Sequence, residues 1–154
     1  MLLIVLSDTH GLLRDSVLPH LEGADQILHA GDVGDPAILE RLGSFAPTLA
    51  VRGNVDHAPG VAELPATLET SFAGVDVRMT HRRADVPDAW LRTRATTLIV
   101  FGHSHRPELD WHGNDTLLLN PGAIGARRFR LPLTLARIRL DNGRIVPELV
   151  AIED

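Results

Sequence analysis

The chain has 154 residues, of which 44% are hydrophobic, and this length and composition suit one domain, over residues 1–154, with a single core. Its formal net charge of −5 argues against a surface that holds nucleic acid by bulk electrostatics, and the absence of cysteine excludes both a disulfide framework and a thiolate metal site. No apolar run approaches the roughly 20 residues that span a bilayer, so we expect a cytoplasmic protein without a membrane partner.

The first half of the chain alternates strand-like and helix-like segments. Three short apolar runs have the unbroken character of buried parallel strands: Met1–Leu6, Gln26–Ala30 and Thr48–Val51. Leucines near helical spacing predict a helix over Arg14–Leu21. A second helix is predicted over Pro36–Leu42, with Asp35 as its N-cap and Gly43 closing it. The first run lacks the basic segment of a signal peptide, so β-α-β-α-β units starting with a buried strand are expected.

The second half is richer in strands. Six further segments are predicted as strands from their apolar, β-branched or alternating sequence: Thr67–Phe72, Val75–Thr80, Thr96–Phe101, Thr116–Leu119, Leu133–Leu140 and Arg144–Ile152. Ala73-Gly74 and Asp141-Asn142-Gly143 are predicted hairpin turns, and Asp85–Arg94, which carries Trp90, is a predicted helix. We therefore expect an α/β fold of two packed sheets with helices outside.

Polar residues directly follow many of the predicted strands. Seven of them, with carboxylate, imidazole or amide side chains, come from five strand ends: Asp8, His10, Asp32, Asn54, His81, His103 and His105. In open α/β sheets the ligand crevice lies outside the carboxyl ends of the strands. These side chains are therefore expected to converge on one place.

The types of donor atom indicate a metal centre. Carboxylates, imidazoles and one amide oxygen suit Mn, Fe, Zn or Ni, whereas a magnesium or calcium site would be built of oxygen alone. Seven ligands exceed the need of one tetrahedral ion but suffice for two ions about 3.5–4 Å apart. Two divalent ions carry more positive charge than two aspartates neutralise, so such a site attracts an anion, with phosphate as the obvious candidate.

Five short motifs occur in order along the chain: D-x-H at Asp8–His10, G-D-x-x-D at Gly31–Asp35, G-N-x-D at Gly53–Asp56, a single histidine at His81, and G-H-x-H at Gly102–His105. In order and spacing they resemble the calcineurin-like metallophosphoesterases, most of all the small single-domain phosphodiesterases of bacteria and archaea, which also carry an N-P-G segment like Asn120-Pro121-Gly122. The resemblance covers the chain from Met1 to about Gly122. It implies a four-layer α/β/β/α sandwich, with two mixed β-sheets flanked by helices.

The resemblance also implies a role for each residue. One ion would be held by Asp8, His10 and His105, the other by Asn54, His81 and His103, with Asp32 bridging both. Asp35 and Asp56 match positions that orient the ligands from outside the coordination sphere. The implied cofactors are two divalent ions, with Mn²⁺ expected first and Fe, Zn or Ni as alternatives.

The implied activity is hydrolysis of a phosphodiester, through attack of a metal-bridging hydroxide in line with the leaving oxygen. The residues expected to act in catalysis are Asp32, Asn54 and His103, and no protein nucleophile is needed. The expected substrate is a small-molecule phosphodiester or a nucleotide, and a homo-oligomer is an open alternative to a monomer.

Two positions depart from the family pattern. Val55 stands where many members have a histidine that assists the leaving group, which favours substrates with good leaving groups. His57 is an alternative acid, but is more simply interpreted as a surface loop histidine. Arg82 and Arg83 follow His81 where the family often reads H-G-H, and they either clamp a phosphate or are solvated loop charges.

Other functions stay open from sequence alone. A non-catalytic protein-binding scaffold of the same fold is one alternative, and a phosphomonoesterase or nucleotide hydrolase is another. One relative of this fold, a subunit of an endosomal sorting coat, is a binding module that has lost ligand histidines. All seven ligand positions are filled with competent residues in this chain, which favours an enzyme.

The remaining polar features have simpler interpretations. His20, His29 and His112 are read as surface or satisfied structural histidines. Arg127, Arg128 and Arg130 form a small basic cluster, interpreted as solvated, with a position facing the active-site cleft or a partner subunit as the alternatives.

Overall fold

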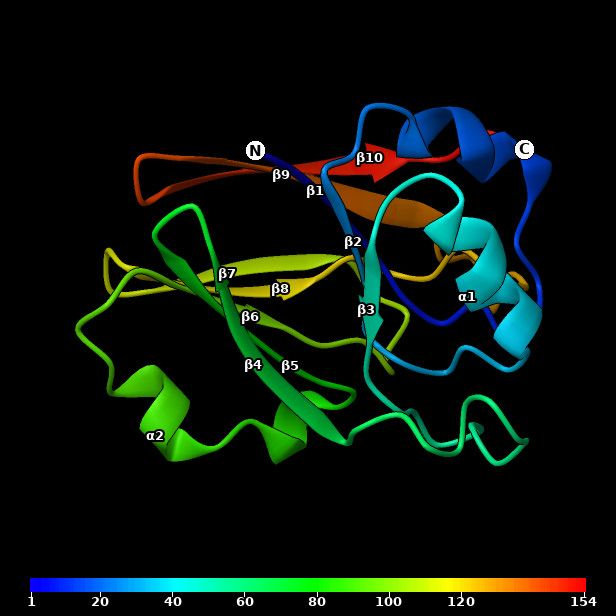
Figure 1. The fold of residues 1–154 in the computed structure, drawn as a ribbon, viewed down its shortest axis with the longest axis horizontal. Helices are drawn as coiled ribbons and strands as arrows, with labels where there is room; N and C mark the ends of the chain where they lie inside the picture. Colours follow the sequence, from blue (N-terminus) through cyan, green and yellow to red (C-terminus); the bar gives the residue numbers. More distant parts are fainter.

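The computed structural model describes residues 1–154, which form two five-stranded sheets packed face to face (Figure 1). One sheet has the order β10-β9-β1-β2-β3 and consists of β1 (Leu2–Leu6), β2 (Gln26–His29), β3 (Thr48–Ala50), β9 (Thr134–Asp141) and β10 (Arg144–Ala151). The other has the order β4-β5-β6-β8-β7 and consists of β4 (Thr67–Phe72), β5 (Val75–Thr80), β6 (Thr97–Val100), β7 (Glu108–His112) and β8 (Thr116–Asn120).

Both sheets are mixed, with a parallel centre. In the first, β1, β2 and β3 are parallel and β9 joins β1 in antiparallel fashion. In the second, β5, β6 and β8 are parallel, while β4 and β7 form antiparallel edges. The carboxyl ends of these parallel strands lead into the loops that carry the candidate site.

The main core lies between the sheets. Alternate residues of facing strands fill it, such as Leu3 and Val5 of β1 against Val77 and Met79 of β5, in a cluster of 16 buried hydrophobic residues. Because successive side chains on a strand point to opposite faces, Ile4 and the other even-numbered residues of β1 pack on the outer side instead.

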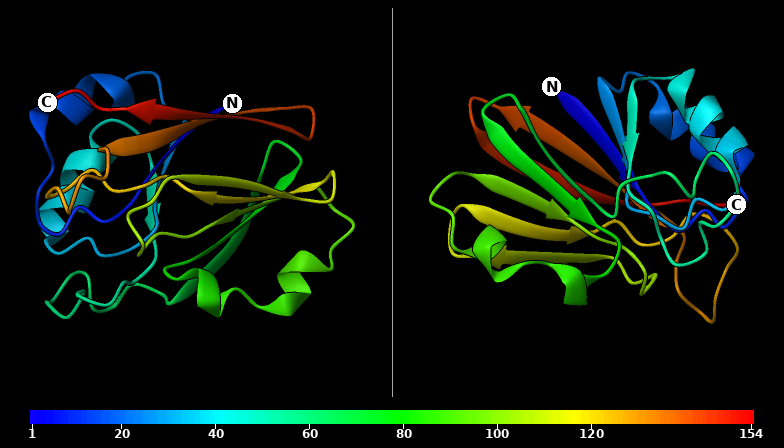
Figure 2. Two further views of the ribbon diagram at one scale, coloured as in Figure 1. Left: turned by 180° about the vertical axis from the view of Figure 1, so that it is seen from behind. Right: turned by 60° about the horizontal axis from the view of Figure 1, so that its bottom comes forward.

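Helical segments cover the outer faces (Figure 2). The 3₁₀-helix η1 (Asp15–Leu21) and the α-helix α1 (Pro36–Gly43) pack on the outside of the first sheet. Asp35 caps α1, since its carboxylate accepts a hydrogen bond from the Ala37 N–H at 2.9 Å. On the outside of the second sheet lie a short 3₁₀-helix, η2 (Arg83–Asp85), and one α-helical turn, α2 (Asp88–Leu91). No helix is both long and apolar enough to cross a membrane.

The architecture expected from the sequence is confirmed, with four local corrections. The segment predicted as helix over Arg14–Leu21 is a 3₁₀-helix, and Pro19 within it has no N–H for an α-helical bond. The helix predicted over Asp85–Arg94 is broken by Pro87, which precedes α2. Gly43 lies inside α1, and Ser44 is its C-cap. The edge strand β7 has no counterpart among the predicted strands.

Candidate metal centre

The structure brings the predicted ligand residues together at the carboxyl ends of the strands. Six of them fall into two groups whose possible ligand atoms lie within 4.8 Å of one another: Asp8, His10 and His105 in one, and Asp32, His81 and His103 in the other. They follow β1, β2, β5 and β6, so both sheets contribute. Asn54, beyond β3, is exposed and lines a cleft beside His81.

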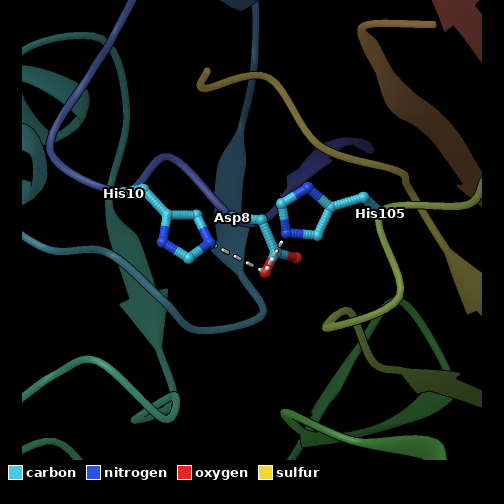
Figure 3. A group of neighbouring side chains, drawn as sticks. All are labelled: Asp8, His10 and His105. Carbon is cyan, nitrogen blue, oxygen red and sulfur yellow. Dashed lines mark ion pairs between the residues drawn. The ribbon is translucent and has the colours of Figure 1, made fainter. Parts of the chain in front are cut away.

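The first group is centred on one carboxylate oxygen (Figure 3). The Oδ1 atom of Asp8 lies 3.6 Å from Nε2 of His10 and 3.3 Å from Nε2 of His105, and the two imidazoles flank the carboxylate. The other oxygen, Oδ2, accepts hydrogen bonds from the Ser7 hydroxyl at 2.6 Å and from the His103 N–H at 3.0 Å. The protein therefore satisfies Oδ2 and leaves Oδ1 facing the two histidines.

The second group has the same organisation. Oδ1 of Asp32 accepts a hydrogen bond from the Val55 N–H at 3.0 Å, while Oδ2 lies 3.2 Å from Nε2 of His81. Nδ1 of His81 donates to the Ala30 carbonyl at 2.7 Å, which leaves Nε2 as a free lone pair directed at the site. The His103 ring lies edge-on to that of His81, with 5.2 Å between centroids.

Four buried polar atoms in this region have no hydrogen-bond partner, and they are the only such side-chain atoms in the protein: Asp8 Oδ1, His10 Nε2, His81 Nε2 and His105 Nδ1. Buried polar atoms are rarely left unpaired, because desolvation without a partner costs about 1–3 kcal/mol each. All four belong to candidate ligands, and nitrogen and carboxylate oxygen are suitable donors for a divalent transition ion. The residues present therefore fit a metal centre.

The charge state of the carboxylates also suits cations. Burial alone raises the pKa of Asp8, but the facing imidazoles of His10 and His105 and the Ser7 hydroxyl outweigh it and hold the pKa well below its usual range. The same opposition between burial and the His81 ring lowers the pKa of Asp32. Burial lowers the pKa of His81, but the Asp32 carboxylate and the Ala30 carbonyl reverse this and raise it. Both aspartates are thus anionic at neutral pH.

Backbone strain is concentrated in the same residues. Of eight non-glycine residues with positive φ, five are candidate ligands: Asp8 at 56°, His10 at 47°, Asp32 at 56°, His103 at 72° and His105 at 62°. Such conformations cost on the order of 1–3 kcal/mol each for most residues and cluster at functional sites. The surrounding structure therefore holds these five residues in a backbone conformation that they would not favour on their own.

Two motif glycines are required by close packing. A Cβ on Gly102 would lie 2.7 Å from Oδ2 of Asp8, and one on Gly31 would lie 2.6 Å from Nδ1 of His81. The glycine before each of Asp32 and His103 therefore lets the backbone of one ligand loop touch the side chain of another.

The two aspartates expected outside the coordination sphere differ in their contacts. Asp56 is buried and accepts hydrogen bonds from the N–H groups of Val33, Gly34 and Gly53, at 3.3, 2.9 and 2.7 Å, which joins the Asp32 loop to the Asn54 loop. Asp35, by contrast, is exposed, and its only side-chain hydrogen bond caps α1. Asp35 therefore makes no hydrogen bond to a candidate ligand, and its side-chain contact is that of a helix cap.

Two supporting residues, Ser7 and Asn120, have no assigned role in the sequence-based prediction. Ser7 binds Asp8, and Asn120 donates to the Gly102 carbonyl at 3.1 Å and to the Ser104 hydroxyl at 3.0 Å, which fixes the turn of the last two histidines. His29 is a satisfied buried histidine, as expected. The sequence signals for these two residues are that Ser7 stands beside Asp8 and that Asn120 begins the N-P-G segment.

His29 connects two ligand loops. Its Nδ1 accepts from the Gly31 N–H at 3.1 Å, so Nε2 carries the proton and donates to the Thr9 hydroxyl at 3.0 Å. Thr9 in turn donates to the Val33 carbonyl at 2.8 Å. Burial lowers the pKa of His29 to about 4, which keeps the ring neutral.

Two open clefts border the candidate ligands. One, of about 420 Å³, is lined by Asn54, His81 and Arg82 among others, and a second, of about 430 Å³, is lined by His103, Arg82 and Arg106 among others. Arg82 lines both and pairs with Asp85 at 3.0 Å. Arg83 is bound by Glu108 and Asp110, and the hydrogen bond to Asp110, more than that to Glu108, raises its pKa. The positive charge of Arg83 is therefore already balanced by these two carboxylates.

Comparisons with known proteins agree with this arrangement. A family model described as the calcineurin-like phosphoesterase superfamily domain matches residues 1–143. A protein of Methanothermobacter thermautotrophicus, described as a probable metallophosphoesterase, is 32% identical over 166 aligned positions, covering 97% of this chain and 92% of that protein.

Solved structures share the fold. A protein of Streptococcus pneumoniae described as a predicted phosphoesterase has a TM-score of 0.72 at 26% identity, over 97% of this chain and 88% of its own. Vacuolar Protein Sorting 29 from Cryptosporidium parvum has a TM-score of 0.76 at 17% identity, over 99% of this chain and 98% of its own. The match of the family model over most of its length shows that this chain belongs to the calcineurin-like phosphoesterase superfamily.

Proposed function

We propose that this member of the superfamily is a dinuclear metal-dependent phosphodiesterase. Membership of the superfamily supports metal-dependent hydrolysis of a phosphoester. The observation that carries the finer proposal is the pair of donor groups joined through Asp32, with four buried donor atoms that have no other partner.

In this proposal each group holds one ion. Asp8, His10 and His105 hold the first, Asn54, His81 and His103 the second, and Asp32 lies between them. Mn²⁺ is the proposed ion, because the histidines disfavour Mg²⁺ and Ca²⁺. Ions bound there would supply a nucleophile at neutral pH by lowering the pKa of coordinated water, and would offset charge on the phosphoryl oxygens.

The chain's own residues orient the substrate. Val55 holds Oδ1 of Asp32, so Oδ2 keeps one direction toward His10 and His81. Asn54 lines one cleft and His103 the other, and both are exposed. We infer that they contact phosphoryl oxygens from two sides, which is why Asp32, Asn54 and His103 are proposed as the residues that act in catalysis.

The two clefts favour a diester over a monoester. A phosphodiester carries two ester groups on the phosphorus, and two clefts are available to them, one lined by His81 and the other by the neighbouring His103. Arg82 lines both clefts, and because its ion pair with Asp85 is half exposed and weak, its guanidinium can turn to a phosphate. Arg83 is not proposed as a phosphate ligand, because two carboxylates occupy it.

The proposed substrate has a good leaving group. Val55 offers no proton at the position where other members have histidine, and His57 lies exposed on the same loop. Protonation of a poor leaving group is therefore not provided by a buried acid next to the site.

The test measures turnover and metal content on the same protein. The chain is stripped with EDTA, reloaded with Mn²⁺ and assayed with bis(4-nitrophenyl) phosphate and with 4-nitrophenyl phosphate. We expect about two ions per chain and higher kcat/KM for the diester. His81→Ala should lose activity, whereas His112→Ala, which removes an exposed histidine of β7, should not.

Two results would contradict the proposal. A folded protein that binds no transition ion would favour the scaffold alternative, and faster turnover of the monoester would favour a phosphomonoesterase.

A further inference from the structure

The loop between β8 and β9 begins at the metal centre. The Ile124 N–H donates to the Ser7 carbonyl at 3.4 Å, and Arg14 Nε donates to the Gly125 carbonyl at 3.0 Å. Gly125 lies so close to the backbone of Asp8 and Thr9 that no Cβ would fit. Beyond this anchored base, residues 126–131 project from the body of the molecule, as the right-hand view of Figure 2 shows in orange. We call residues 126–131 the arginine loop.

The arginine loop carries positive charge without counter-ions. Arg127, Arg128 and Arg130 are all exposed, and none has an ion pair or a side-chain hydrogen bond. By contrast, Arg82, which precedes η2, and Arg83, its first residue, are both paired with carboxylates. In a chain of net charge −5, three unpaired guanidinium groups within four residues form a local cluster of positive charge.

An aromatic ring stands among these charges. Phe129 is 96% exposed and adopts a φ of 56°, which is unfavourable for a bulky residue. It sits in a tight turn closed by the hydrogen bond from the Leu131 N–H to the Arg128 carbonyl at 3.3 Å. Glycine is the residue that such a backbone conformation favours. The turn instead presents a phenyl ring to solvent with no packing partner inside the protein.

The inner side of the loop faces the candidate ligands. A narrow crevice is lined by Arg127, Arg128 and Leu131 on the loop side and by His105 on the site side. The crevice is too narrow to admit a water molecule. A substrate whose scissile phosphate lies at the metal centre would therefore reach the guanidinium groups and the ring over the exposed face of the loop.

We propose that the arginine loop is the subsite for a nucleotide part of the substrate, with Phe129 stacking on a base and the arginines binding a phosphate other than the scissile one. The inference rests on the proposed function. Base–aromatic stacking and guanidinium–phosphate pairing are the contacts that bind short single-stranded nucleotides. A simple aliphatic diester offers neither a base nor a second phosphate, so the preferred class is a dinucleotide with a terminal phosphate.

The test separates binding from turnover. The Mn²⁺-loaded protein is titrated with 5′-phosphoadenylyl-adenosine in which methylene replaces the bridging oxygen of the internal phosphodiester linkage. The triple variant Arg127→Ala, Arg128→Ala, Arg130→Ala and the variant Phe129→Ala should each weaken binding at least about tenfold. Phe129→Ala should leave binding of the abasic analogue unchanged. Arg94→Ala is the control, because it removes an exposed arginine that precedes β6, whereas His103 and His105 follow the other end of this strand. This variant should bind the dinucleotide as tightly as the wild type does.

The outcomes distinguish this inference from the proposed function. If the wild type binds the dinucleotide through the loop but hydrolyses no diester, the function fails and the subsite stands. If diesters are hydrolysed and the loop variants bind the dinucleotide as tightly as the wild type, the subsite is overturned. A change of oligomeric state in Phe129→Ala by sedimentation, without a change in dinucleotide affinity, would also overturn it in favour of a contact between copies of the chain.

Discussion

Nε2 of His10 lies 3.5 Å from Oδ2 of Asp32, and this approach joins the two donor groups into one centre. The same oxygen lies 3.2 Å from Nε2 of His81. A carboxylate oxygen between two imidazoles from different groups is the arrangement that two neighbouring cations would need. In the same centre, Oδ1 of Asp8 and the Nε2 atoms of His10 and His81 are buried and have no hydrogen-bond partner.

Loading the protein with metal should stabilise it, because the unpaired donor atoms gain partners only in the folded state. At a free Mn²⁺ concentration of about 100 times Kd, linkage predicts about 2.7 kcal/mol and a rise in Tm of roughly 5–10 °C for each site, and therefore roughly 10–20 °C for both. Differential scanning fluorimetry in EDTA and in Mn²⁺ measures this. An equal Tm in both conditions would argue that the ligands hold no ion.

Asp56→Asn and Asp35→Ala should separate a positioning carboxylate from a helix cap. Asp56 accepts three backbone hydrogen bonds that join two ligand loops, so its replacement should destabilise the fold by about 2–3 kcal/mol and weaken metal binding about 10–100-fold. Asp35→Ala should lose only the cap, about 1 kcal/mol, with metal affinity retained. Urea unfolding and metal titration measure both quantities, and equal loss of affinity in the two variants would contradict the assignment.

Gly102→Ala should disrupt the centre from the backbone. The new methyl group would press on the Ser7 and Asp8 side chains, with an expected cost of about 1–3 kcal/mol and weakened metal binding. Gly43→Ala is the matched control, because it lies in α1 with open space around it and should stabilise the protein by up to about 1 kcal/mol. If the free energy of unfolding changes in the same direction from the wild type in both variants, the packing argument is wrong.

Stability should fall in mild acid because of His29. Burial lowers its pKa from 6.5 to about 4, so the unfolded chain takes up the proton first as the pH drops. Between about pH 4 and pH 6.5 the free energy of unfolding should rise by about 1.4 kcal/mol per pH unit, which is about 3 kcal/mol over the whole range.

The difference between wild type and His29→Gln isolates this contribution. Glutamine keeps one hydrogen-bond donor and one acceptor in place of the ring nitrogens that bind Thr9 and Gly31, but it does not titrate. The difference also removes the contribution of His81, whose raised pKa adds stability at low pH that is lost as pH increases. Urea denaturation from pH 4 to 7 is the measurement, and an identical pH slope in the two proteins would refute the role of His29.

Much of the fold follows from sequence because its central strands are buried on both faces. All five residues of β1 are buried, so their unbroken apolar run predicts the strand, and the candidate ligand Asp8 lies two residues beyond its end. The edge strand β7 has no such apolar run. It offers only a five-residue alternation of polar residues with two exposed apolar ones, which is a weaker signal than a buried run.

Because β7 is not predicted from the sequence, the ion pairs of Arg83 are not predicted either. Its partners Glu108 and Asp110 both lie on β7, so the choice between a phosphate clamp and a solvated charge could not include an ion pair with a neighbouring strand. Hydrogen bonds between loops, such as those of Asp56 and Asn120, are likewise invisible until the sheets are assembled.

The most direct test of the account is the metal content of Asp32→Asn beside the wild type, measured by mass spectrometry on Mn²⁺-loaded, gel-filtered protein together with diester turnover. Because Asp32 contacts both donor groups, we predict about two ions per chain in the wild type, one or none in the variant, and a loss of kcat/KM of at least about a hundredfold. Two tightly bound ions and normal turnover in Asp32→Asn would contradict a shared centre.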